Sequence, residues 1–152
     1  MKSINRKKWI EEFVKINTKE GNLISLKFNY PQNVFYEAIK KQALENKPIR
    51  VIVLKARQEG ISTVTESLIF ANIVNSTNKK AGIITHKDDA TNNLYTMTKL
   101  MYDNMPTNFR PETKYSNARE LVFNNETGTG LNSSIRCMTA GSSGTGRSFT
   151  YH

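Results

Sequence analysis

The chain has 152 residues, which is long enough for one domain with its own hydrophobic core. Hydrophobic residues make up 38% and charged residues 23%, which is typical of a folded globular protein and excludes an intrinsically disordered one. Twenty-two Lys and Arg against 13 Asp and Glu give a net charge of +9. This charge predicts affinity for polyanions such as DNA, RNA or nucleotide phosphates. A basic surface without a specific partner is the alternative.

Cysteine use and hydropathy narrow the class of protein further. Cys137 is the only cysteine, so no intrachain disulfide can form, and we expect its thiol to pack in the core. No apolar run approaches the roughly 20 residues that span a bilayer, and the first residues lack the apolar stretch of a signal peptide. No zinc-type ligand spacing occurs. The sequence predicts a soluble, cytosolic protein without membrane contact.

The first 30 residues predict a helix followed by a strand. Trp9 and Phe13 recur at helical spacing within residues 4–17, with charged residues on the other faces. Residues 24–28 alternate apolar and polar side chains, as a half-buried strand does. We interpret residues 1–30 as an adjunct to the main domain.

Helices and strands then alternate along the chain. The predicted order is a helix from Pro31 to near Asn46, a strand at Arg50–Leu54, a helix at Ile61–Val74, a strand at Ala81–His86 and a helix capped by Asp88 that ends at Pro106. The β-branched run at Arg50–Leu54 is typical of a strand buried on both faces of a parallel sheet. The alternation predicts an α/β fold with a mostly parallel sheet flanked by helices.

The pattern changes after residue 107. Glu120–Asn125 and Ser133–Thr139 are predicted strands around a Gly-containing turn, and Ala140–Arg147 is a loop rich in Gly and Ser. The final residues from Phe149 predict the start of another strand. Neither a repeat nor a linker interrupts residues 31–152, so we expect them to form one domain.

A polar loop separates the predicted strand Arg50–Leu54 from the helix that begins near Gly60. Unpaired N–H groups and the helix dipole stabilise a phosphate at such a helix start. The usual phosphate-loop pattern is not met, because Ile61 occupies the position of its Lys. The positive charge would therefore have to come from Lys55 or Arg57.

This loop resembles the deviant phosphate loops of the large terminase subunits of tailed phages. The shared pattern is K-x-R-Q-x-G-x-S-T, formed here by Lys55, Arg57, Gln58, Gly60, Ser62 and Thr63. The resemblance implies a phosphate-loop NTPase that binds ATP and Mg²⁺, with Ser62 holding the metal and Lys55 or Arg57 replacing the usual Lys. Arg57 is implied to act in catalysis as well. The implied nucleotide-binding residues are Gln32, Lys55, Arg57, Gln58, Glu59, Gly60, Ile61, Ser62 and Thr63.

Two outlying segments extend the resemblance. Tyr30 to Gln32 is similar to the adenine-recognition segment of terminases, in which the amide of Gln32 would pair with the base edge. An exposed polar residue in the first turn of a helix is the alternative. Residues 140–152 resemble the glycine-rich segment of these motors, which implies that Arg147 is an arginine finger. Contact of Arg147 with DNA phosphate or solvent is the alternative.

The resemblance also implies what this chain lacks. No Asp or Glu follows Glu126, so residues 31–152 correspond to a partial ATPase domain that ends before the Walker B strand and the nuclease domain. We therefore expect ATP binding without useful hydrolysis. The implied partners are double-stranded DNA, a portal protein, a small terminase subunit and further copies in a homo-oligomeric ring, in the cytoplasm of a bacterial host. Another phosphate-loop DNA translocase or helicase and a non-enzymatic basic DNA-binding module are the alternative functions.

Overall fold

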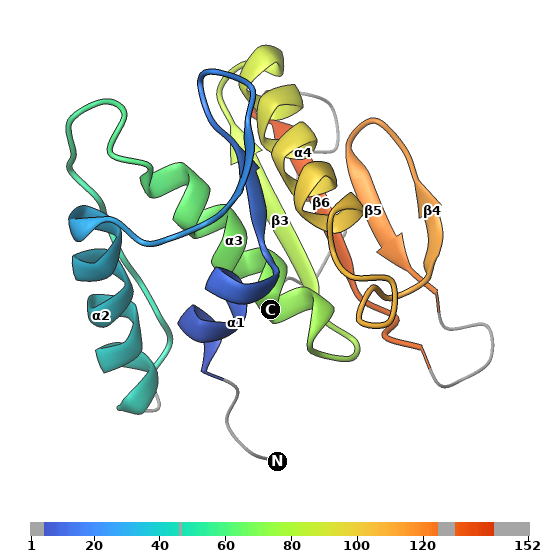
Figure 1. Ribbon diagram of the computed structural model, residues 1–152, viewed down its shortest axis with the longest axis horizontal. Helices are drawn as coiled ribbons and strands as arrows, with labels where there is room; N and C mark the ends of the chain where they lie inside the picture. The colour runs from blue at the N-terminus through green and yellow to red at the C-terminus, as the bar shows by residue number, and fades with distance from the viewer. Residues whose placement is uncertain (1–4, 46, 125–129, 142–152) are drawn as a thin grey trace.

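The computed structural model describes residues 5–45, 47–124 and 130–141 and shows a mixed α/β fold (Figure 1). Its elements in chain order are α1 (Arg6–Phe13), β1 (Lys15–Asn17), β2 (Leu23–Ser25), α2 (Tyr30–Leu44), α3 (Ile61–Val74), β3 (Lys80–Thr85), α4 (Asp88–Asp103), β4 (Thr113–Ser116), β5 (Glu120–Phe123) and β6 (Ser134–Thr139). The predicted helices after Pro31, at Ile61–Val74 and after Asp88 are confirmed, and so are the predicted strands at β3, β5 and β6.

The main sheet has four described strands in the order β3-β6-β5-β4. β3 and β6 pair in parallel, whereas β6 with β5 and β5 with β4 are antiparallel. The predicted α/β fold with a parallel strand pair is confirmed, but among the described strands the sheet is mixed rather than mostly parallel. The physical reason is connection length: residues 117–119 join β4 to β5, and so short a turn can connect only antiparallel strands. β3 and β6 are far enough apart in the chain to run in the same direction.

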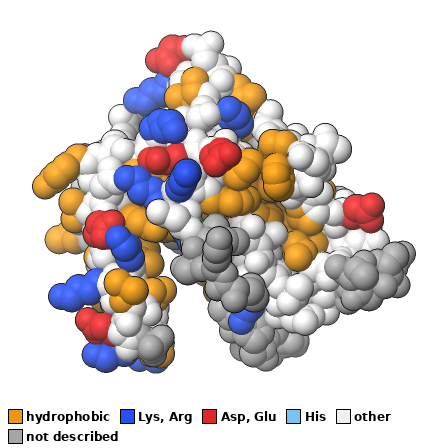
Figure 2. Space-filling model, turned by 60° about the horizontal axis from the view of Figure 1, so that its bottom comes forward, with side chains coloured by type: hydrophobic (Ala, Val, Ile, Leu, Met, Phe, Trp, Pro, Cys, Tyr) orange, Lys and Arg blue, Asp and Glu red, His pale blue; other side chains and the backbone are white. Residues whose placement is uncertain are grey.

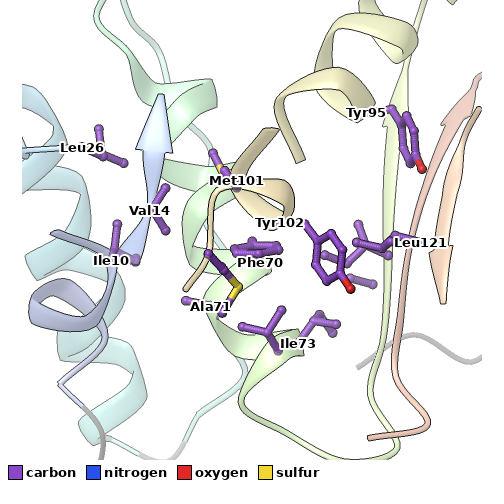
Figure 3. Packing of buried hydrophobic residues seen from close by; sticks show 14 of the residues in the cluster. Ile10, Val14, Leu26, Phe70, Ala71, Ile73, Tyr95, Met101, Tyr102 and Leu121 are labelled. Atoms are coloured by element: carbon purple, nitrogen blue, oxygen red, sulfur yellow. The ribbon is translucent and has the colours of Figure 1, made fainter. Parts of the chain in front are cut away.

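The hydrophobic core lies between this sheet and helices α3 and α4, with α1 and the β1–β2 hairpin packed on the outside of the helices (Figures 1 and 3). The strand register places Ala81, Ile135 and Leu121 side by side, and all three are buried. Phe70 from α3 and Met101 from α4 are fully buried against them. Each such side chain stabilises the fold by about 1.5–3 kcal/mol relative to exposure.

The N-terminal segment differs from its prediction. The sequence predicts a helix over residues 4–17, but α1 ends at Phe13 and Val14 turns into extended backbone with φ −90° and ψ 125°. Ile16 then pairs with Ile24 in the β1–β2 hairpin. The helical spacing of the apolar residues therefore predicts the structure correctly as far as Phe13. The β-branched residues that follow favour extended backbone, and strand pairing in the hairpin stabilises them in that conformation.

The prediction of a buried strand at Arg50–Leu54 is also wrong. The segment belongs to no strand of the described residues, and the side chains of Ile52 and Leu54 are 100% and 101% exposed. A β-branched run favours extended backbone, but a strand also needs a neighbour that accepts its N–H and C=O groups. No described strand pairs with this segment, so it remains unpaired.

Substitution of Ile52 tests this exposure. Ile52→Asn is expected to change the free energy of unfolding by no more than about 0.5 kcal/mol, because an exposed side chain loses no packing. Ile135→Asn in β6 is the matched control and should cost several times more, since Ile135 is fully buried. Urea denaturation of both variants provides the measurement. If Ile52→Asn lowered the free energy of unfolding as much as Ile135→Asn, the segment would be a buried strand.

Asp88 is the first residue of α4 rather than its cap, which is Lys87, so the predicted capping role is wrong. Cys137 is buried as expected, and burial raises the pKa of its thiol to about 12, with the charge of Glu66 adding to the effect. The sequence pattern does not predict strand β4. None of the described helices is long and apolar enough to cross a membrane.

Candidate nucleotide-binding site

The loop that precedes α3 is an open, exposed turn. Gln58 and Gly60 both have left-handed backbone, with φ of 67° and 71°, and α3 begins directly afterwards at Ile61. The predicted junction of polar loop and helix is therefore confirmed, although its preceding strand is not. Glycine adopts the left-handed region without steric cost, which explains its use at position 60. The side chain of Gln58 remains in solvent.

The amino end of α3 presents free backbone donors. Gly60 caps the helix without a side chain that could accept a hydrogen bond, and the first helical hydrogen bond runs from Val64 N–H to the Gly60 carbonyl. Within the described residues, the N–H groups of residues 61–63 consequently have no hydrogen-bond acceptor. Free donors at the positive end of a helix dipole are suited to binding a phosphate.

The start of α2 holds this loop in place. Gln32 accepts a hydrogen bond from the backbone N–H of Asn29 at 3.0 Å and donates one from Nε2 to the Gly60 carbonyl at 2.9 Å. Asn29 Nδ2 donates to the carbonyl of Glu59 at 3.3 Å. Gln32 is only 4% exposed, so the alternative of an exposed polar residue is wrong. Its predicted contact with adenine stays a prediction, and its described contacts position the loop.

Three basic side chains surround the turn. Lys55 and Arg57 are exposed, and among the described residues Lys55 donates only to the neighbouring carbonyl of Ala56, at 3.2 Å. Lys19, from the turn between β1 and β2, donates to Gln58 Oε1 at 3.1 Å. Sequence reasoning missed Lys19, because it lies 39 residues from Gln58 and no local pattern marks it. Against these cations, residues 55–60 carry one acid, Glu59.

The side chains at the start of α3 divide between core and solvent. Ile61 is 7% exposed, which explains why an apolar residue occupies the position of the usual Lys. The hydroxyl of Ser62 is exposed and has no partner among the described residues. Thr63 is half-buried and faces α4 across a cleft. No group of three or more His, Cys, Asp or Glu that could hold a metal ion occurs in the described part of the chain.

A second polar cluster lies where the parallel strands β3 and β6 end. Thr91 is fully buried, and its hydroxyl contacts the hydroxyls of Thr85 at 2.6 Å and Thr139 at 2.8 Å. Asp88 accepts hydrogen bonds from Thr139 and Arg119, and both interactions lower the pKa of its carboxyl group, Thr139 more strongly. These groups satisfy one another, so the cluster ties the strand ends to the start of α4.

The remaining predicted site residue is Arg147, which lies outside the described residues, as do most of the glycine-rich loop and the final strand start. The surface of the described residues is mixed in character. Figure 2 shows one face, on which Lys and Arg side chains gather toward the side of α1 and α2, interspersed with acidic and hydrophobic side chains. This distribution does not by itself define a DNA-binding surface.

Comparison with known protein families and with curated protein sequences finds no match. The resemblance to terminases therefore stays a prediction from the sequence residues quoted above.

Proposed function

We propose that this chain binds Mg·ATP at the loop before α3 and is the nucleotide-binding part of a DNA-packaging motor of the large terminase type. The observation that carries the proposal is the amino end of α3: free backbone N–H groups follow an open turn that bears Lys55 and Arg57. Backbone donors, helix dipole and nearby cations together stabilise a polyphosphate.

The residues present fit the cofactors that the resemblance implies. Ser62 has a free hydroxyl on the first turn of α3, where it can contribute to holding a magnesium ion together with phosphate oxygens. Lys55 or Arg57 supplies the charge that Ile61 cannot, because the side chain of Ile61 is buried. Gln32 donates a hydrogen bond to the Gly60 carbonyl and so holds the turn in place at the start of α3.

The net charge of +9 supports DNA as the macromolecular partner, because counterion release favours basic proteins on a polyanion. A motor that contains this chain would couple ATP hydrolysis to the translocation of double-stranded DNA.

Nucleotide binding by charge variants tests the loop assignment. Combined Lys55→Ala and Arg57→Ala is expected to weaken binding of a fluorescent ATP analogue at least about tenfold, because two charge-assisted phosphate contacts are lost. Combined Lys40→Ala and Lys41→Ala on α2 is the control, since it removes the same charge from an exposed helix. Fluorescence titration at fixed ionic strength measures both.

The alternatives give different results in the same titration. Equal weakening by the two double variants would mean that the loop residues contribute only general electrostatic attraction and are not the nucleotide-binding site. If the folded protein binds no nucleotide but binds duplex DNA with strong salt dependence, it is a basic DNA-binding module instead.

A further inference from the structure

A cleft beside the phosphate loop is not explained by the fold. It lies between β1, the first turn of α3 and α4, and has a volume of about 230 Å³. Ile16, Met97 and Leu100 form its apolar part, and all three are only partly buried. We call this space the hairpin cleft. Its volume is below the roughly 300–1,000 Å³ of typical ligand pockets, so it suits a single ring system rather than a whole nucleotide.

The polar rim of the hairpin cleft is free to bind. Asn17 from β1, Thr63 from α3 and Asn93 from α4 line it, and their side chains have no hydrogen-bond partner among the described residues. An Asn amide offers both donors and acceptors, and so can pair with the edge of a heteroaromatic ring. An apolar floor with a few convergent polar groups is the usual composition of a small-molecule site.

The hairpin cleft adjoins the proposed phosphate site in two ways. Thr63 lines the cleft and lies only three residues after Gly60, an axial distance of about 4.5 Å along α3. The β1–β2 hairpin contributes Asn17 to the cleft, while Lys19 from the same hairpin contacts Gln58 in the loop. The β1–β2 hairpin therefore borders both the hairpin cleft and the loop before α3. A molecule that lies across the first turn of α3 reaches both sites.

We propose that the hairpin cleft is the base subsite of the nucleotide site and takes the nucleobase of the ATP whose phosphates lie at the amino end of α3. This inference rests on the proposed function and adds residues to it. Met97 and Leu100 contact the faces of the base, and the amides of Asn17 and Asn93 contact its edge. Gln32 is then a positioning residue that acts on the loop, in keeping with its burial and its bond to Gly60.

Methyl NMR of the five methionines provides a direct test of the base contact. The probes are ATP and inorganic tripolyphosphate, which share the phosphates but not the base. The Met97 methyl signal, assigned with Met97→Leu, is expected to shift on addition of ATP through the ring current of the base. Tripolyphosphate should leave it in place while it perturbs the backbone signals of residues 60–63.

Adjacent asparagines provide matched variants for affinity. Asn93 lines the hairpin cleft, whereas Asn92 is exposed on the same helix and does not line it. Asn93→Leu is expected to weaken ATP binding about tenfold and to leave tripolyphosphate binding unchanged. Asn92→Leu should change neither.

The outcomes separate the two proposals. An unmoved Met97 methyl, together with equal ATP affinities of the two Asn variants, overturns the base subsite even when ATP and tripolyphosphate still bind at the loop. Failure of both ATP and tripolyphosphate to bind overturns the proposed function, and the base subsite with it.

Discussion

The contribution of Glu66 to the free energy of unfolding is expected to fall by about 3 kcal/mol between pH 4.5 and pH 7. Glu66 is only 3% exposed in α3, and burial raises the pKa of its carboxyl group to about 7, while the hydrogen bond with Thr98 opposes this rise. Below pH 4.5 both the folded and unfolded states hold the proton. Between the two pKa values only the unfolded state ionises, so stability falls as the pH rises and the loss is complete above about pH 7.

The neighbours of Glu66 do little to offset the effect of its burial. The hydroxyl of Thr98 contacts both Glu66 Oε1 and the carbonyl of Leu94, the latter at 3.1 Å. Thr98 donates to both oxygens with a single hydrogen, so its bond to Glu66 offsets the burial of the carboxyl group only in part. Cys137 lies near enough to Glu66 for the two groups to interact, and its raised pKa keeps it a neutral thiol.

Glu66→Gln is the variant that isolates this effect. The amide is nearly isosteric with a protonated carboxyl group and its oxygen can accept the hydrogen bond from Thr98, so we expect wild-type stability at pH 4.5 and about 3 kcal/mol more stability than wild type at pH 8. Urea denaturation of both proteins at several pH values measures the difference. Parallel stability curves for wild type and Glu66→Gln across this range would contradict a buried, protonated Glu66.

Gly60→Ala is expected to cost about 2–3 kcal/mol of stability, for two reasons that add. The backbone at position 60 is left-handed, with φ +71°, which alone costs an L-residue about 1–2 kcal/mol. A Cβ atom there would also lie 2.5 Å from Gln32 Nε2. Gln32 is buried and holds both the Gly60 carbonyl and the N–H of Asn29, so it cannot move aside without losing a hydrogen bond.

Gly21→Ala separates the two reasons. Gly21 has a similar φ of +83°, but no atom lies within 4 Å of the position that a Cβ atom would take there. Gly21→Ala should therefore lower the stability only by the cost of left-handed backbone, without a steric clash. In a double-mutant cycle, Gln32→Ala removes the clashing group, so its combination with Gly60→Ala should be less destabilising than the sum of the single changes. Equal costs at Gly21 and Gly60 would mean that Gln32 does not press against the loop.

Much of the helical structure is predictable from local signals. The start of α2 follows from Asn29 and Pro31, a capping side chain and a residue suited to the first helical turn. α3 has the predicted bounds of Ile61–Val74, because Gly60 precedes it and apolar residues fill its buried face. The polar turn before α3 is likewise visible in the sequence as a loop ahead of a helix. These features depend on residues that are close in sequence.

The strands and the surroundings of the loop are less predictable. Arg50–Leu54 has the composition of a buried strand but lacks a partner among the described strands, whereas β4 has no clear strand pattern and pairs with β5. The contacts of Lys19 with Gln58 and of Gln32 with Gly60 join residues 39 and 28 positions apart. No periodicity in the sequence encodes such contacts.

The sequence by itself determined the helix starts, the turn at Gly60, the burial of Cys137 and the basic charge, because each follows from local backbone preference or from composition. Only the tertiary structure decided which strands pair, that Glu66 is buried beside Thr98, and that the β1–β2 hairpin borders both the loop and the hairpin cleft. The physical reason is that a strand or a buried polar group is stabilised by partners distant in the chain, whereas a helix satisfies most of its backbone hydrogen bonds within itself.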